Sequence, residues 1–84
     1  MDRLTYIDVA ASPPLQYGDN PLNENELLSV RALITYVAYT KNLHEDTVSE
    51  IVRTRFDVPE VTKLRQRNYD DAVRFLVDFT ESIN

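Results

Sequence analysis

Residues 23–41 read NENELLSVRALITYVAYTK, and this stretch decides the fold of the 84-residue chain. Asn23 followed three residues later by Glu26 is the pattern of a capping box, which predicts that a helix starts directly after Asn23. Apolar residues then recur at helical spacing, so we expect a helix over about 24–41. Asn42 suits the left-handed conformation that often ends a helix. Because this helix is apolar on nearly all sides, we expect it to be central or to be covered in part by a partner.

Two further amphipathic segments follow, and they predict helices over about 44–56 and about 67–82. Between them, Pro59 disfavours a helix at the residue before it. Apolar residues spaced by three in this connection favour a compact loop pinned to the core or a turn of 3₁₀ helix; they are Val58, Val61 and Leu64. The sequence therefore predicts an all-α fold, a compact three-helix domain over 23–84 with short connections.

Residues 1–22 differ in character from the rest of the chain. The β-prone stretch Leu4–Val9 is followed by Pro13 and Pro14, which block regular structure, and Tyr17–Pro21 is rich in turn-forming residues. We expect an N-terminal arm over 1–22 that is irregular or contains one short strand.

Composition narrows the classes of function. The chain is acidic, with 9 Lys+Arg against 14 Asp+Glu and a net charge of −5, and it contains no Cys, one His and one Gly. No apolar run approaches the roughly 20 residues of a membrane span, and the N-terminus lacks the features of a signal peptide. We expect a cytoplasmic protein without a membrane contact.

The sequence contains few residues that could form a catalytic or cofactor-binding site. His44 beside Glu45 and Asp46 is either an acid–base pair, a weak metal site or an exposed helix start, and the last interpretation is favoured because no further ligand stands nearby. Asp70 and Asp71 are best explained as acids in the first turn of a helix. We expect no enzyme activity, no cofactor, no metal site and no small-molecule substrate.

A basic segment lies between two acidic ones. Residues 51–67 carry five cations against two acids, and the cations are Arg53, Arg55, Lys63, Arg65 and Arg67. One interpretation is a phosphate-facing patch on a helix-turn-helix-like corner, which would bind DNA with a steep salt dependence. The other, which we favour, is a solvated rim that pairs with acids of the neighbouring helices.

The tyrosines form a second candidate surface. We expect Tyr36 and Tyr39 to lie on different faces of the first helix, so that they do not both point to the same core. Together with Tyr6 of the arm they predict a self-association or partner-binding surface, since tyrosine is enriched at protein interfaces. The alternative is that they pack within the monomer and keep their hydroxyl groups at the surface.

The segment IVRTRFDVPEVTKLRQRNYDDAVRFL, residues 51–76, resembles the short C-terminal domains of phage antirepressors and related phage regulatory proteins, and the likeness extends over about residues 30–79. In that family a helix ends in a basic residue and Phe, and a small loop then leads to a helix that begins with Tyr and two acids. Asp57 stands where the family pattern has Gly. The matching residues are Arg55, Phe56, Val58, Leu64, Tyr69, Asp70, Asp71, Ala72, Val73, Phe75 and Leu76.

The resemblance implies a regulatory or accessory protein of a mobile element that binds DNA or another protein, and it implies no catalytic residues. Two hypotheses follow. The first is a protein-interaction module, with a protein partner or a homodimer. The second is a small DNA-binding regulator that uses the basic segment.

Overall fold

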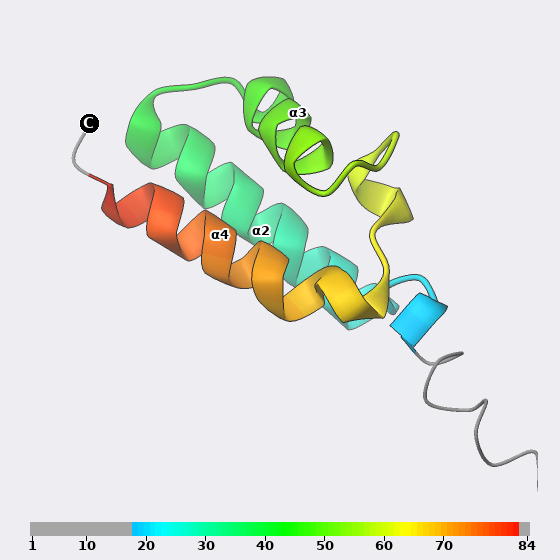
Figure 1. Cartoon of the computed structure of the whole chain (residues 1–84). Coiled ribbons are helices and arrows are strands. Elements are labelled where there is room, and N and C mark those ends of the chain that lie inside the picture. Colours follow the sequence, from blue (N-terminus) through cyan, green and yellow to red (C-terminus); the bar gives the residue numbers. More distant parts are fainter. Residues whose placement is uncertain (1–17, 83–84) are drawn as a thin grey trace, which may run out of the picture.

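The computed structural model describes residues 18–82, and this part of the chain is built from three α-helices without a strand (Figure 1). The predicted all-α, three-helix fold is confirmed. The helices are α2 (Glu24–Lys41), α3 (Glu45–Arg55) and α4 (Tyr69–Glu81). Two short 3₁₀ helices, η2 (Val61–Lys63) and η3 (Gln66–Asn68), lie in the connection between α3 and α4.

Helices α2 and α4 lie side by side and run in the same direction (Figure 1). At one end, the ammonium group of Lys41 donates a hydrogen bond to the carbonyl oxygen of Ser82, 2.5 Å away, so the two C-termini are neighbours. At the other end, Nε2 of Gln66, just before α4, lies 3.2 Å from Oε1 of Glu26 in the first turn of α2. Helix α3 runs back across α2, and the connection after it returns the chain to the starting end.

The boundaries of α2 follow from the residues that cap it. Oδ1 of Asn23 accepts a hydrogen bond from the backbone amide of Glu26 at 2.8 Å, and Oε1 of Glu26 accepts one from the amide of Asn23 at 2.9 Å. This reciprocal pair is the predicted capping box. Asn42 ends the helix with φ 58° and ψ 47°, the left-handed conformation that its short amide side chain tolerates.

The other two helices are slightly shorter than predicted. Helix α3 starts after His44, whose side chain makes no capping hydrogen bond, and ends at Arg55 rather than 56. Helix α4 begins two residues after the expected start at about 67, because residues 66–68 form the 3₁₀ turn η3. The tighter turn forms where the backbone amide of Asn68 donates to the carbonyl of Arg65 at 2.8 Å.

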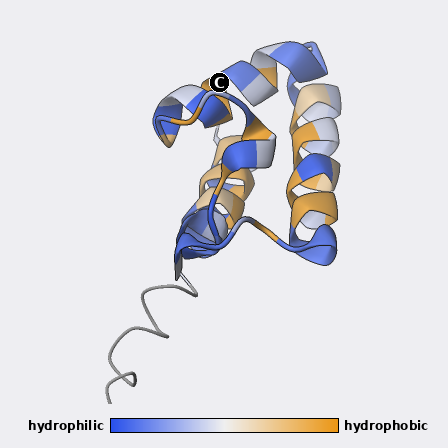
Figure 2. Ribbon diagram, turned by 90° about the vertical axis from the view of Figure 1, so that its right-hand side faces the viewer, coloured by the Kyte–Doolittle hydropathy of each residue, from blue (hydrophilic) through white to orange (hydrophobic). Residues whose placement is uncertain are grey.

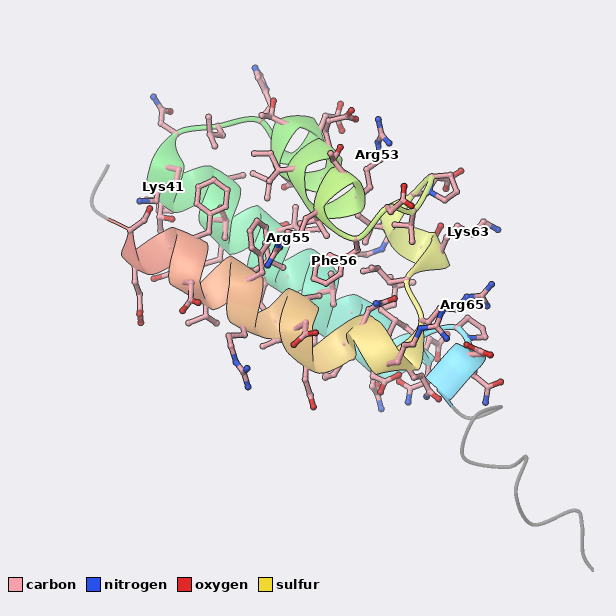
Figure 3. All side chains as sticks on the ribbon, in the orientation of Figure 1. Lys41, Arg53, Arg55, Phe56, Lys63 and Arg65 are labelled. Atoms are coloured by element: carbon pink, nitrogen blue, oxygen red, sulfur yellow. The ribbon has the colours of Figure 1, made fainter. Side chains whose placement is uncertain are left out.

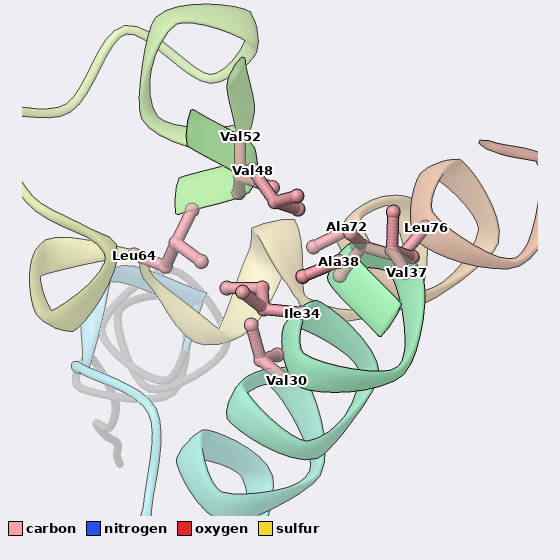
Figure 4. Close-up of a cluster of buried hydrophobic side chains, with 9 residues drawn as sticks. All are labelled: Val30, Ile34, Val37, Ala38, Val48, Val52, Leu64, Ala72 and Leu76. Carbon is pink, nitrogen blue, oxygen red and sulfur yellow. The ribbon is translucent and has the colours of Figure 1, made fainter. Parts of the chain in front are cut away.

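The core is a single cluster of nine buried apolar side chains, drawn in Figure 4. The three helices each contribute, and Leu64 adds a fully buried side chain from the connection. Of the two alternatives for this connection, a core-pinned loop or a 3₁₀ turn, both features are present, since η2 is a 3₁₀ turn and Leu64 directly after it is buried. Hydrophobic residues lie mainly in the helices, and the connections are mostly hydrophilic (Figure 2). The buried residues are Val30, Ile34, Val37, Ala38, Val48, Val52, Leu64, Ala72 and Leu76.

The described chain before α2 is tied to the connection before α4. The amide of Gln66 donates to the carbonyl of Asn20 at 2.8 Å, and the amide of Leu22 donates to the carbonyl of Leu64 at 3.4 Å. Residues 18–22, which we assigned to the arm, therefore contact the helical domain. The predicted strand at 4–9 lies outside the described residues.

Candidate functional site

One face of α2 points away from both neighbouring helices and carries large apolar side chains. Leu28 is 66% exposed, Tyr36 is 56% exposed and Tyr39 is 85% exposed. Ala32 and Thr35 lie between them and are also exposed. We call these five residues the outer face of α2. They lie opposite the buried stripe of the same helix, so α3 and α4 leave this face uncovered.

The outer face of α2 is also almost free of charge. Among the exposed residues between Asn25 and Thr40, only Arg31 is charged. The exposed side of α4 has the opposite character, with five charged residues, namely Asp70, Asp71, Arg74, Asp78 and Glu81. The solvent-facing side of a helix is ordinarily polar, as in α4. The apolar outer face of α2 is therefore not that of a helix whose exposed side only contacts water.

The placement of the two helix tyrosines corrects one expectation. Tyr36 and Tyr39 are both exposed, and residues three apart on a helix are neighbours, so the expectation of different faces was wrong. The alternative, in which both rings pack within the monomer, does not hold for Tyr39. Tyr6, the third tyrosine of this prediction, lies outside the described residues.

The five predicted cations do not share one face. Arg53 forms an ion pair with Glu50 one turn earlier on α3, with Nε of Arg53 2.9 Å from Oε1 of Glu50. This hydrogen bond, reinforced by the charge of the carboxylate, raises the pKa of the Arg53 guanidinium above its ordinary value. Arg55 instead lies with its guanidinium carbon 5.4 Å from the centre of the Phe75 ring, a cation–π contact between α3 and α4 (Figure 3).

The remaining three cations come together around a shallow, open hollow of about 420 Å³ below the end of α3. Lys63, Arg65 and Arg67 line it, together with Asp57. Arg67 forms an ion pair with the carboxylate of Asp19, and a terminal guanidinium nitrogen of Arg65 donates to the Asp19 carbonyl at 2.9 Å.

Lys63 points outward and has no ion-pair partner within residues 18–82 (Figure 3). Among residues 18–82, two of the five cations therefore contact carboxylates. Arg55 contacts an aromatic ring, Arg65 donates to a backbone carbonyl and Lys63 is exposed to solvent.

Residues 18–82 contain neither a metal-binding cluster nor a membrane-spanning helix. No group of three or more His, Cys, Asp or Glu side chains converges there. His44 is exposed at the start of α3, and Asp70 and Asp71 are exposed in the first turn of α4. None of the three helices combines the length and the apolar character that crossing a membrane requires.

Comparisons with protein-family models, curated proteins and solved structures gave no match to this chain. The candidate surfaces are therefore supported by geometry alone. Sequence reasoning named Tyr36 and Tyr39 but did not place Leu28, Ala32 and Thr35 with them. The spacing in the sequence could have identified this face, since residues 28, 32, 35 and 39 follow one another at intervals of four, three and four, as residues on one side of a helix do.

Proposed function

We propose that this protein is a non-enzymatic protein-interaction module that binds its partner through the outer face of α2. The observation that carries the proposal is the exposure of Leu28, Tyr36 and Tyr39 on one nearly uncharged side of a helix. Clustered apolar exposure is uncommon on monomeric soluble proteins and marks interaction sites. Tyrosine in particular is enriched among residues that dominate binding energy.

The regulatory role of such a module rests on the resemblance to phage antirepressor-like proteins. On that basis we propose an accessory or regulatory protein of mobile-element origin that acts in the cytoplasm. Its partner would be a protein, because an apolar, uncharged helix face complements apolar protein surface and offers no positive charge to phosphate groups.

The test is a binding experiment with the immobilised full chain and two matched variants. In the first, Leu28→Glu and Tyr39→Glu place charge on the outer face of α2. In the control, Val77→Glu makes the same kind of change at a residue of α4 that is 36% exposed. We expect a partner captured by the native chain to be lost with the first variant and retained by the control, and to bind directly once purified. Equal capture by all three would remove the outer face of α2 from the proposal.

A second function is favoured by one observation, the gathering of Lys63, Arg65 and Arg67 around one hollow. These cations would contact DNA phosphates, as the DNA-binding hypothesis requires. Against this stand the net charge of −5 and the presence of Asp19 and Asp57 beside the same cations.

Fluorescence anisotropy with mixed-sequence duplex DNA at low and moderate salt tests this function. Binding that falls steeply with salt would support DNA recognition if it is lost when all five cations of the basic segment are replaced by Gln. The control is Arg74→Gln, an exposed position on α4 outside the hollow. Absence of binding at micromolar protein concentration would exclude this function.

A further inference from the structure

We infer that the outer face of α2 binds a second copy of this chain, with the two α2 helices antiparallel. This inference rests on the proposed function, since it names the partner of the same surface. In this arrangement Leu28 of each copy packs against Tyr39 of the other, and Ala32 packs against Thr35 of the other.

The spacing of the exposed residues is that of a helix–helix seam. Leu28, Ala32, Thr35 and Tyr39 follow one another at intervals of four, three and four residues, which is the pattern that keeps a line of side chains facing a partner helix. All four are exposed, so the other described elements of the monomer do not use the seam. Helix α2 therefore carries two faces: a buried one that packs against α3 and α4, and a second one with the geometry of helix pairing.

The sizes of these side chains make the seam complementary to itself when one helix is reversed. The two central residues, Ala32 and Thr35, are small and permit close approach of the helix axes, towards the short end of the usual range of about 8–10 Å. The two outer residues, Leu28 and Tyr39, are large. In the antiparallel pair, Ala32 of one copy faces Thr35 of the other at the centre, and Leu28 faces Tyr39 at each end. A parallel pair would set Tyr39 directly against Tyr39 of the second copy and would align the two helix dipoles.

Charge also favours a second copy over an acidic or basic partner. Arg31 is the only charged residue among the exposed positions from Asn25 to Thr40, so the pairing buries no row of like charges. Close to the seam, Glu45, Asp46 and Glu50 of α3 line a hollow with Arg31 and Thr35. Repulsion between these exposed acids of the two copies is screened by salt.

The exposed area of the outer face of α2 limits the size of the interface. From their exposed fractions of 56% and 85%, Tyr36 and Tyr39 together expose on the order of 200–350 Å² per copy, given about 150–250 Å² for an aromatic side chain. With Leu28 and the central residues, the contact stays below about 1,200 Å² in total, the size of weak and transient complexes. We expect a reversible dimer that dissociates on dilution.

The absence of cysteine from the chain allows a direct test by disulfide trapping. Two single variants of the full chain, Leu28→Cys and Tyr39→Cys, are mixed, one of them carrying a mass tag, and oxidised mildly. Each mixed pair keeps one native Leu28–Tyr39 contact. We expect the 28–39 mixed disulfide to form at least about tenfold faster than disulfides of the exposed α4 control Asp78→Cys, because pairing raises the effective concentration of the two thiols.

Sedimentation of the native chain supplies an independent readout. We expect a monomer–dimer equilibrium that shifts towards the dimer as salt rises, the opposite of the salt effect on a DNA complex. Predominance of 28–28 and 39–39 disulfides would overturn the antiparallel arrangement. A monomer at all accessible concentrations, with no acceleration over the control, would overturn the second copy as partner. If that monomer still loses a purified heterologous partner on Leu28→Glu and Tyr39→Glu, the proposed function survives the failure of this inference.

Discussion

At the scale of single residues, two positions within residues 18–82 adopt left-handed backbone conformations, and one of them was predicted. Asn42, with φ 58°, was predicted because asparagine after a helical stretch is a common terminator. Asp57, with φ 57°, was not predicted, because an aspartate gives a weaker local signal of this conformation than glycine does. The structure places Asp57 in the conformation that glycine adopts most readily, at the position where the antirepressor-like pattern has Gly.

Asp57→Gly should therefore stabilise the protein. Glycine removes the steric cost of the left-handed conformation, and the change also removes an acid from the C-terminal end of α3, where the helix dipole disfavours it. We expect the free energy of unfolding in urea to rise by about 0.5–1 kcal/mol. Asp57→Val should lower it, since a β-branched residue is strained at positive φ. Equal effects of the two changes would contradict the backbone assignment.

The effect of a Leu→Ala substitution on the free energy of unfolding depends on how deeply the leucine is buried. Leu76 is fully buried and Leu28 is 66% exposed, so the same substitution tests the core and the outer face. Leu76→Ala should lower the free energy of unfolding by about 2–5 kcal/mol through lost apolar contacts and a cavity. Leu28→Ala, measured at low micromolar concentration where the monomer dominates, should change it by less than about 0.5 kcal/mol. A fully stable Leu76→Ala variant would show that the core is misplaced.

At the scale of elements, the sequence predicted best where capping residues mark a boundary. Helix α2 has the predicted bounds because Asn23 and Glu26 form a capping box at its start and Asn42 adopts a left-handed conformation at its end. The start of α4 was predicted only to within two residues, because nothing in Gln66-Arg67-Asn68 distinguishes a 3₁₀ turn from the first turn of an α-helix. The outer face of α2 was only half identified, since an all-round apolar helix does not reveal which side its neighbours cover.

One pair of substitutions measures how much the capping box of α2 contributes to the free energy of unfolding. Asn23→Ala removes the side-chain acceptor for the amide of Glu26, and we expect it to lower the free energy of unfolding by about 1 kcal/mol. Asn25→Ala makes the same change at an exposed helical position and should be neutral or slightly stabilising, because alanine favours helix. Thermal or urea denaturation followed by circular dichroism measures both. A loss with Asn25→Ala as large as that with Asn23→Ala would argue against the cap.

At the scale of the whole molecule, the parallel course of α2 and α4 was not predictable. Short connections favour antiparallel neighbours, and the sequence gives no sign that α3 and the following connection together bring the chain back to its starting end. What fixes the arrangement is a set of contacts between distant residues, including those of Asn20 with Gln66 and of Leu22 with Leu64. The placement of the cations was unpredictable for the same reason, since Asp19 and Arg67 are 48 positions apart in the sequence.

Removing residues from the N-terminus tests how much the contacts of Asn20 with Gln66 and of Leu22 with Leu64 contribute to stability. A variant lacking residues 1–17 keeps them, and a variant lacking residues 1–22 loses both backbone hydrogen bonds and the partly buried Leu22. We expect both variants to retain the helical circular dichroism spectrum. The shorter chain should unfold with a free energy lower by about 1–3 kcal/mol, at about 0.5–1.5 kcal/mol for each hydrogen bond. Identical stability of the two variants would show that residues 18–22 contribute nothing to the fold.

The parallel pairing of α2 and α4 has a mechanical consequence. The chain enters α2 at one end of the pair and leaves α4, beside Lys41, at the other. A stretching force applied through the two chain termini would slide the two helices past each other along their common axis. Contacts along the whole length of the pair must then yield together, whereas an antiparallel hairpin pulled from adjacent termini opens one contact at a time. For its size, this small domain should therefore resist extension along the chain more strongly than its modest core suggests.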